Sequence, residues 1–128
     1  MRLHHAALVS SSEANADRFY EDILKLRKIK TALLKSDLAS SLFGVEVECS
    51  LILYGNDNFA IEVFVPKLVP SKKELFMHLC LEVDDREGFL ARCRSEGLKI
   101  KLVPRGDSQI CFVQDFDGNQ FEIKQAIS

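Results

Sequence analysis

Two short stretches, LHHAALV at residues 3–9 and MHLCLEV at residues 77–83, read as one apolar strand that occurs twice. In each stretch a histidine directly precedes a run of apolar residues. Alternate side chains of a strand point to opposite faces, so a strand of this kind can place its histidine apart from part of its apolar set. Its recurrence within 128 residues predicts an internal duplication, in which the elements after each stretch also repeat.

The segments that follow the two stretches are predicted to repeat in one order. Ser12 is a candidate N-cap for the first helix, because serine side chains accept hydrogen bonds from the first helical turn. Asp84 and Asp85 play that part for the second helix, and Gly97 is its stop signal. The predicted elements are strands at 2–9, 28–34, 46–54 and 59–65 with a helix at 13–25, then strands at 75–83, 98–103, 108–114 and 119–125 with a helix at 84–97.

Each half therefore reads β-α-β-β-β. We expect an α+β fold made of two tandem βαβββ modules, each a curled mixed sheet that forms a cup-like cleft. The chain length suits one domain over residues 1–128, with module one at about 1–66, a connector at 67–74 and module two at about 75–128. YGNDN at 54–58 and Asp117-Gly118 are the strongest hairpin-turn signals.

Composition narrows the function. Lys and Arg number 17 against 19 Asp and Glu, and they form no basic stripe, which argues against a nucleic-acid binder. No apolar run approaches the roughly 20 residues that span a bilayer, and the N-terminal segment lacks a signal-peptide layout. We expect a soluble, cytoplasmic protein. The four cysteines, Cys49, Cys80, Cys93 and Cys111, form no C-x-x-C pair and are interpreted as small buried hydrophobes.

Four residues stand out by their placement. His5 and His78 lie in the first strand of each half, and Glu62 and Glu122 lie in the last. Alternation sets His78, Glu62 and Glu122 opposite the apolar faces of their strands, on the concave side of each sheet. His4 adjoins His5, and alternation does not choose between them. The match to MHLCLEV favours His5.

Two neutral imidazoles and two carboxylates form a plausible ligand set for a divalent metal ion. Nitrogen donors suit nickel, cobalt, zinc or ferrous iron, and carboxylates also admit manganese. A lone strand histidine is more often structural and a lone strand-end glutamate is more often solvated. The symmetric placement of all four residues is what favours a metal site.

The chain resembles the vicinal-oxygen-chelate superfamily, also called the glyoxalase/bleomycin-resistance/dioxygenase group. The resemblance is carried by HHAALVSSSEANADRFYEDILKL, by HLCLEVDDREGFLARCRSEGLKI and by FVQDFDGNQFEI, with Phe116 where the family has proline and Lys25 where many members have glycine. It implies tandem βαβββ modules, metal ligands at His5, Glu62, His78 and Glu122, and frequent dimers. We therefore expect a homodimer that binds a small molecule and neither nucleic acid nor membrane.

The resemblance implies a glyoxalase-like, metal-dependent lyase or isomerase that acts on a small substrate with vicinal oxygens. Glu62 and Glu122 would be its catalytic residues, acting as metal ligands and proton shuttles. Val9 and Pro66 stand where glyoxalase I has an arginine and an asparagine for glutathione, so we expect a different substrate. Two alternatives stay open: a metal-free binding protein of the bleomycin-resistance type, and a ferrous extradiol-type dioxygenase.

The first half is longer than the second between its two candidate ligands. Glu62 follows His5 by 57 positions, whereas Glu122 follows His78 by 44. The extra length falls in the segment 35–48, which is predicted to be a loop that forms a lid or wall of the pocket. Lys124, Arg105 and Tyr54 are further candidates for polar groups near the site, although each is more often a surface residue.

Overall fold

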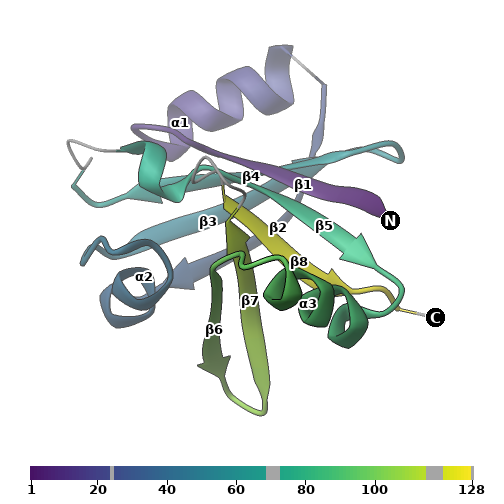
Figure 1. Ribbon diagram of the computed structural model, residues 1–128. Coiled ribbons are helices and arrows are strands. Elements are labelled where there is room, and N and C mark those ends of the chain that lie inside the picture. Colours follow the sequence, from purple (N-terminus) through teal and green to yellow (C-terminus); the bar gives the residue numbers. More distant parts are fainter. Residues whose placement is uncertain (24, 69–72, 115–119, 128) are drawn as a thin grey trace. The chain divides into compact units, whose positions relative to one another are not determined.

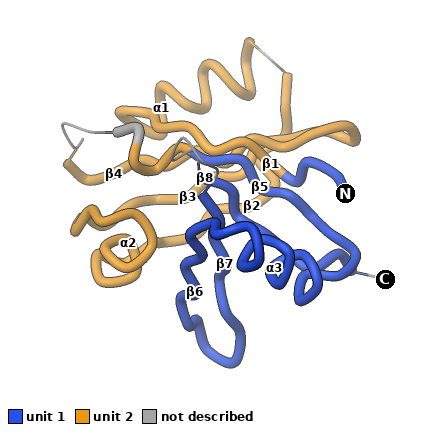
Figure 2. The backbone as a smooth tube through the Cα atoms, viewed as in Figure 1, with its two compact units in different colours: residues 1–4, 78–128 blue, residues 5–77 orange. Residues whose placement is uncertain are grey.

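A computed structural model describes residues 1–23, 25–68, 73–114 and 120–127. The chain divides into two compact units (Figure 2). We call residues 5–77 the N-terminal module, and residues 1–4 with 78–128 the C-terminal module. Each module is described by itself.

The N-terminal module holds a four-stranded mixed sheet in the order β2-β3-β4-β1 (Figure 1). β1 pairs parallel with β4, and the β2-β3-β4 meander is antiparallel. Its strands are β1 (Arg2–Val9), of which residues 2–4 belong to the C-terminal module, β2 (Arg27–Leu34), β3 (Cys49–Gly55) and β4 (Ala60–Pro66). Its helices are α1 (Glu13–Ala16), the π-helix η1 (Asp17–Ile23), α2 (Ser36–Phe43) and the short 3-10 helix η2 (Lys73–Phe76).

The C-terminal module repeats this topology with the order β6-β7-β8-β5. β5 pairs parallel with β8, and β6, β7 and β8 form an antiparallel meander. Its elements are β5 (His78–Val83), α3 (Arg86–Ser95), β6 (Ile100–Arg105), β7 (Ser108–Gln114) and β8 (Gln120–Gln125). The α+β fold with tandem βαβββ modules, expected from the sequence, is therefore confirmed.

The first helix of each module begins with the same kind of cap. Ser12 has extended backbone angles, and its hydroxyl accepts a hydrogen bond of 3.1 Å from the amide of Asn15. Asp85 is also extended, and its carboxylate accepts one of 3.0 Å from the amide of Gly88. Both caps satisfy an amide three residues into the helix, where no backbone acceptor is available. The predicted N-cap at Ser12 is confirmed.

A small hydrophobic core lies between each helix and one face of its sheet. In the N-terminal module Ala16 and Tyr20 of the helix pack with Ile52, Tyr54 and Val63. In the C-terminal module the corresponding cluster is Val83, Leu90, Cys93, Cys111, Val113 and Ile123. Because strand side chains alternate, the residues between these core positions point to the opposite face of each sheet.

Several expected boundaries differ from the structure. The segment 35–48, predicted to be a loop, contains α2, which a glycine in the left-handed region ends at Gly44. β3 begins at Cys49 rather than near residue 46, and β5 begins at His78 because η2 occupies Lys73–Phe76. The Asp117-Gly118 turn lies outside the described residues. YGNDN does connect β3 and β4, with the Asn56 carboxamide oxygen accepting from the amides of Asn58 and Phe59.

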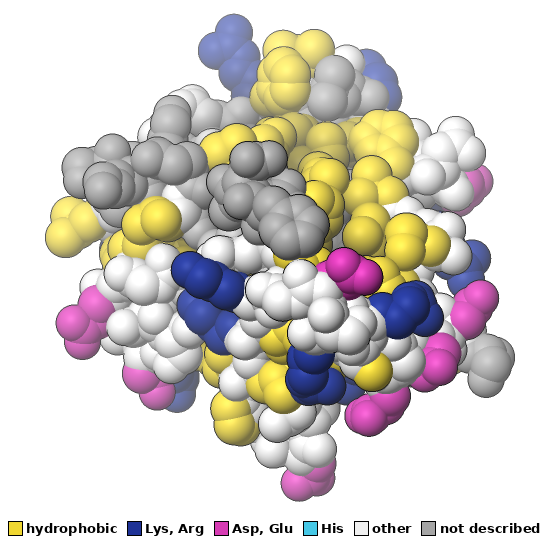
Figure 3. Space-filling model, in the orientation of Figure 1, with side chains coloured by type: hydrophobic (Ala, Val, Ile, Leu, Met, Phe, Trp, Pro, Cys, Tyr) yellow, Lys and Arg dark blue, Asp and Glu magenta, His cyan; other side chains and the backbone are white. Residues whose placement is uncertain are grey.

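All four cysteines are buried, as predicted. Burial, followed by the neighbouring charge of Glu48, raises the pKa of Cys49 to about 11. On the visible face of the molecule, acidic and basic side chains are interspersed, and hydrophobic side chains also reach the surface (Figure 3). Within the described ranges, no helix has the length and apolar character needed to cross a bilayer.

Candidate metal centre

In the N-terminal module, His5 of β1 and Glu62 of β4 come together on the sheet face opposite the helix. The parallel pairing of these strands sets Ala7 beside Glu62, and His5 is two residues earlier on the same face. His5 Nε2 lies 3.6 Å from Glu62 Oε1. The imidazole is buried, with 1% of its side chain exposed, whereas 22% of the Glu62 side chain is exposed.

In the C-terminal module, His78 of β5 and Glu122 of β8 form an equivalent pair. Cys80 lies beside Glu122, and His78 is again two residues earlier. His78 Nε2 lies 3.4 Å from Glu122 Oε1, with side-chain exposures of 1% and 16%. The ring of Phe112 packs edge-on against the His78 ring, with centroids 5.1 Å apart. A buried imidazole and a partly exposed carboxylate therefore recur in both modules.

Strand register shows which histidine of the first strand corresponds to His78. Ala7 is the register partner of Glu62, and Cys80 is the register partner of Glu122. In each module the histidine two positions before this partner lies on the same face of the sheet as the glutamate. That position is His5, and His4 has the opposite parity in β1. His4 itself belongs to the C-terminal module. Burial and then the positive charge of Lys124 lower the pKa of His4, whereas the negative charges of Glu82 and Glu122 act to raise it.

The two pairs can each be tested for their fit to a divalent ion. Two ligand atoms bound to one ion at about 2.1 Å stand about 3.0–3.4 Å apart, depending on the angle between the bonds. The nitrogen–oxygen separations of 3.6 and 3.4 Å are close to this range. One nitrogen and one carboxylate oxygen per module are also the donor types that nickel, cobalt, zinc and iron accept. Each pair therefore fits half of a ligand set.

The other polar residues singled out in the sequence have different surroundings. Tyr54 is fully buried in the core on the helix side, where its hydroxyl donates a hydrogen bond of 2.8 Å to Asp17. Burial and then this hydrogen bond raise the pKa of Tyr54. Arg105 is exposed at the end of β6. Lys124 shares the face of Glu122 by alternation in β8.

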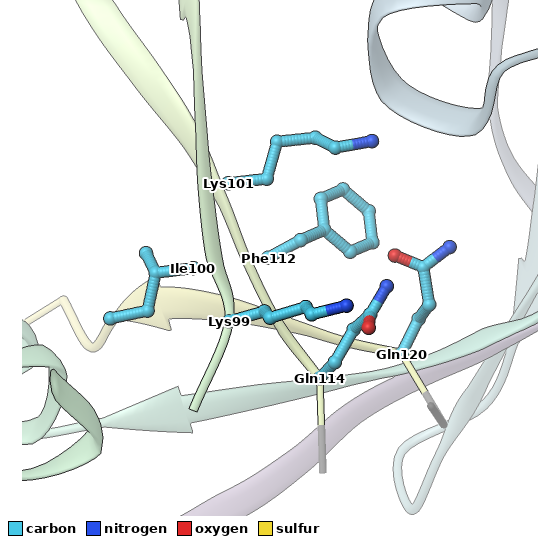
Figure 4. Close-up of a pocket in the computed structure, with 6 residues that line it drawn as sticks. All are labelled: Lys99, Ile100, Lys101, Phe112, Gln114 and Gln120. Carbon is cyan, nitrogen blue, oxygen red and sulfur yellow. The ribbon is translucent and has the colours of Figure 1, made fainter. Parts of the chain in front are cut away.

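The structure also reveals a pocket that the sequence analysis did not predict. It has a volume of about 410 Å³ and lies in the C-terminal module (Figure 4). Alternation within each strand was visible in the sequence, but the register that sets Phe112 between Lys101 and Glu122 was not. The lining residues are Lys99, Ile100, Lys101, Phe112, Gln114 and Gln120.

The repeated modules agree with a comparison against known families. The sequence profile of the Glyoxalase/Bleomycin resistance protein/Dioxygenase superfamily matches residues 2–123. The chain belongs to this superfamily. The match covers both modules and includes all four candidate ligands of this glyoxalase-superfamily protein. None of the curated proteins searched matches the chain.

Solved structures share the superfamily fold with this chain. A hypothetical protein from Bacillus halodurans C-125 has a TM-score of 0.70 at 18% identity, covering 99% of this chain and 95% of that one. Methylmalonyl-CoA epimerase from Mycobacterium tuberculosis has a TM-score of 0.67 at 15% identity, with coverages of 98% and 88%. A variant of Streptomyces coelicolor methylmalonyl-CoA epimerase, in complex with 2-nitronate-propionyl-CoA, has a TM-score of 0.67 at 15% identity. That match covers 100% of this chain and 99% of the other. These likenesses concern the fold.

Proposed function

We propose that this protein is a metal-dependent enzyme of the glyoxalase-like type, a lyase or isomerase acting on a small substrate with vicinal oxygens. His5, Glu62, His78 and Glu122 would hold one divalent ion. The observation that carries the proposal is the recurrence of a buried imidazole within 3.6 Å of a carboxylate at equivalent register positions of both modules. One metal ion held by both pairs would explain why the imidazole and the carboxylate occur in each half of a duplicated fold.

The four side chains divide the chemistry by type. When bound, a divalent ion supplies a Lewis acid that stabilises negative charge developing on substrate oxygens. The side chains of His5 and His78 are almost fully enclosed, so their imidazoles would hold the ion in a fixed position. The carboxylates are partly exposed, so Oε1 of Glu62 or Glu122 can reach a substrate carbon and accept or return its proton.

Two comparisons bear on the reaction class. The superfamily name includes glyoxalases, and methylmalonyl-CoA epimerases recur among the similar solved structures. Epimerisation removes a proton from a carbon and returns it to the other side, for which two carboxylates are suitable bases. Val9 and Pro66 end β1 and β4 without a side-chain hydrogen-bond donor, which supports a substrate other than glutathione adducts. A homodimer is part of the proposal, since superfamily members often pair.

Metal binding by tag-free protein tests the proposal. Protein stripped with a chelator is titrated with Ni²⁺, Co²⁺, Zn²⁺, Mn²⁺ and, without oxygen, Fe²⁺, by calorimetry and thermal melting. We expect one ion per chain, and an increase in unfolding free energy of about 2.7 kcal/mol at a hundredfold excess over Kd. His5→Ala, His78→Ala, Glu62→Gln and Glu122→Gln should each weaken binding by about a hundredfold or more, because loss of even an outer partner weakens metal sites 10–100-fold.

Glu96→Gln is the matched control, because it removes an exposed carboxylate at the end of α3, on the opposite side of the sheet from Glu122, and should leave metal affinity within about twofold of wild type. If wild type and the four ligand variants hold equally little metal, the metal-dependent function is wrong and a metal-free binding protein is favoured. Oxygen uptake with catechols by the ferrous protein would instead identify a dioxygenase.

A further inference from the structure

The pocket of the C-terminal module lies on the same sheet face as Glu122. Gln120 and Glu122 share a face of β8, and Phe112 is the register partner of Glu122 on β7. Phe112 also pairs with Lys101 of β6 and packs against the His78 ring at 5.1 Å. The Phe112 ring therefore joins the pocket to the His78–Glu122 pair.

The lining of the pocket combines an apolar floor with nitrogen donors. Figure 4 shows Lys99, Lys101, Gln114 and Gln120 extending around the Phe112 ring, whereas Ile100 points away from them. Lysine amines and glutamine amides are hydrogen-bond donors, and the amines also carry positive charge. Among the described residues that line the pocket, none is a carboxylate. The volume of about 410 Å³ is in the range of small-molecule sites.

Among the described residues, the side-chain amine of Lys99 takes part in none of the ion pairs. The backbone oxygen of Lys99 accepts a hydrogen bond of 3.0 Å from the Gln114 amide. Lys99 and Lys101 are both largely exposed to solvent. As far as the described residues are concerned, the Lys99 amine is therefore available for a ligand.

The amide and aromatic positions of this lining have no counterpart in the N-terminal module. Register matches Phe112 to Leu53, Gln114 to Gly55 and Gln120 to Ala60, all of them without a polar side chain. The positions of Lys99 and Lys101 correspond to Arg27, which lies 3.6 Å from Asp57, and to Lys30. The glutamine amides and the Phe112 ring are thus particular to the C-terminal module, whereas positively charged residues occupy the two lysine positions in both modules.

We propose that this pocket binds an oxyanionic group of the substrate, a carboxylate or a phosphoester, through Lys99 and Lys101 with help from the Gln114 and Gln120 amides. The inference rests on the proposed function, since it names the substrate class of that site. The carbon skeleton would lie on Phe112, and the reacting carbon would be near Glu122. Lys101 and Glu122 are separated by β7, or about 10 Å between strands, so the anionic group is at the end of the substrate away from the reacting carbon.

Calorimetry on metal-stripped protein at low ionic strength tests the pocket apart from the metal. The probes are succinate, inorganic phosphate and succinamide, the last a neutral match for succinate. We expect succinate or phosphate to bind and succinamide to bind at least tenfold more weakly. Lys99→Gln and Lys101→Gln should each weaken anion binding about tenfold, in keeping with hydrogen bonds to charged groups. Tighter binding of succinate indicates a carboxylate substrate, and tighter binding of phosphate indicates a phosphoester.

Arg94→Gln is the charge-matched control in the same module. Arg94 is exposed on α3, which covers the opposite face of the sheet through Leu90 and Cys93. This variant should bind the anion within twofold of wild type. The proposal is overturned if neither anion binds, if succinamide binds as tightly as succinate, or if Arg94→Gln weakens binding as much as Lys99→Gln.

Metal titration of the Lys99→Gln/Lys101→Gln double variant separates this inference from the proposed function. Normal metal affinity with lost anion binding supports both. Lysine-dependent anion binding in a protein that binds no metal would preserve the pocket and remove the metal-dependent function. Metal binding by wild type without lysine-dependent anion binding would support the metal-dependent function and overturn the anion pocket. A melting temperature near that of wild type shows that the double variant is folded.

Discussion

The two modules share a topology and a pair of residues but differ in almost everything around them. In both, the first strand runs parallel to the last, and a histidine and a glutamate occupy equivalent positions 3.4–3.6 Å apart. Their helices, insertions and pocket linings differ. Strand register is preserved between the modules, because a shift of one residue would turn the histidine or the glutamate to the opposite face.

The helices differ in how they turn and end. In the C-terminal module the Leu98 amide bonds to the Cys93 oxygen, five residues back, and Gly97 takes a φ of +78°. In the N-terminal module the Leu26 amide bonds to the Tyr20 oxygen, six residues back, and Lys25 has a φ of +61°. The wider closure agrees with the π-helical turns of η1, which hold one extra residue.

The N-terminal module also carries the insertion α2. Phe43 of α2, Phe64 of β4 and Phe76 of η2 form an aromatic cluster with ring centroids 5.1–5.2 Å apart. Phe64 shares the face of Glu62 by alternation, so the insertion covers part of that face. The extra length predicted to form a wall beside the site is therefore a helix packed through its aromatic side chain.

The largest expected effect comes from breaking this aromatic cluster. Phe64→Ala should lower the free energy of unfolding by about 3–5 kcal/mol, because a buried phenyl ring is replaced by a cavity. Phe19→Ala is the control, since 47% of Phe19 is exposed, and it should have a much smaller effect. Urea denaturation measures both. Equal losses would show that the cluster does not hold α2 on the sheet.

A second prediction concerns the polar network of the N-terminal module. Asp17 accepts from Tyr54 and pairs with Lys28 at 2.8 Å, and the corresponding position to Tyr54 in the other module is the apolar Val113. Asp17→Ala should lower stability by about 1–3 kcal/mol at neutral pH, because the buried Tyr54 hydroxyl loses its acceptor. Asp17→Asn keeps an acceptor oxygen and should lower stability by less.

The stability that the Asp17 carboxylate contributes should depend on pH. Hydrogen bonds first from Lys28 and then from Tyr54 hold the pKa of Asp17 below its ordinary value of 3.8. A carboxyl with a lowered pKa in the folded state adds stability that is fully present above its ordinary pKa and is lost as pH falls through the lowered value. The difference between wild type and Asp17→Asn should therefore shrink below about pH 4. A difference that stays constant to pH 2 would contradict the role of the charge.

The smallest expected effect lies at the helix ends. Lys25→Gly should raise stability by about 0.5–1 kcal/mol, because glycine adopts a positive φ without the steric penalty of a side chain. Gly97→Ala makes the converse change in the C-terminal module and should lower stability by about 1 kcal/mol. Thermal melting of the two variants gives the comparison. Destabilisation by Lys25→Gly would mean that the lysine side chain compensates for its backbone conformation.

Most of the fold was predictable because it depends on local signals. Alternation within 108–114, the helical spacing after Ser12 and the glycine at Gly97 each specify an element from neighbouring residues alone. The segment 35–48 was predicted incorrectly, because a serine-rich stretch with weak periodicity becomes helical through the burial of Leu42 and Phe43. Local propensity is a weak guide where tertiary packing supplies most of the stabilisation.

The duplication, the order of the elements and the strand residues that share a face can be inferred from the sequence, since these follow from periodicities along one chain. The register between strands is known only from the folded structure. Register fixes the separations within the His5–Glu62 and His78–Glu122 pairs and places Phe112 beside Lys101 and Glu122. Register is set by hydrogen bonds and packing between segments distant in the chain, and no residue encodes its partner alone.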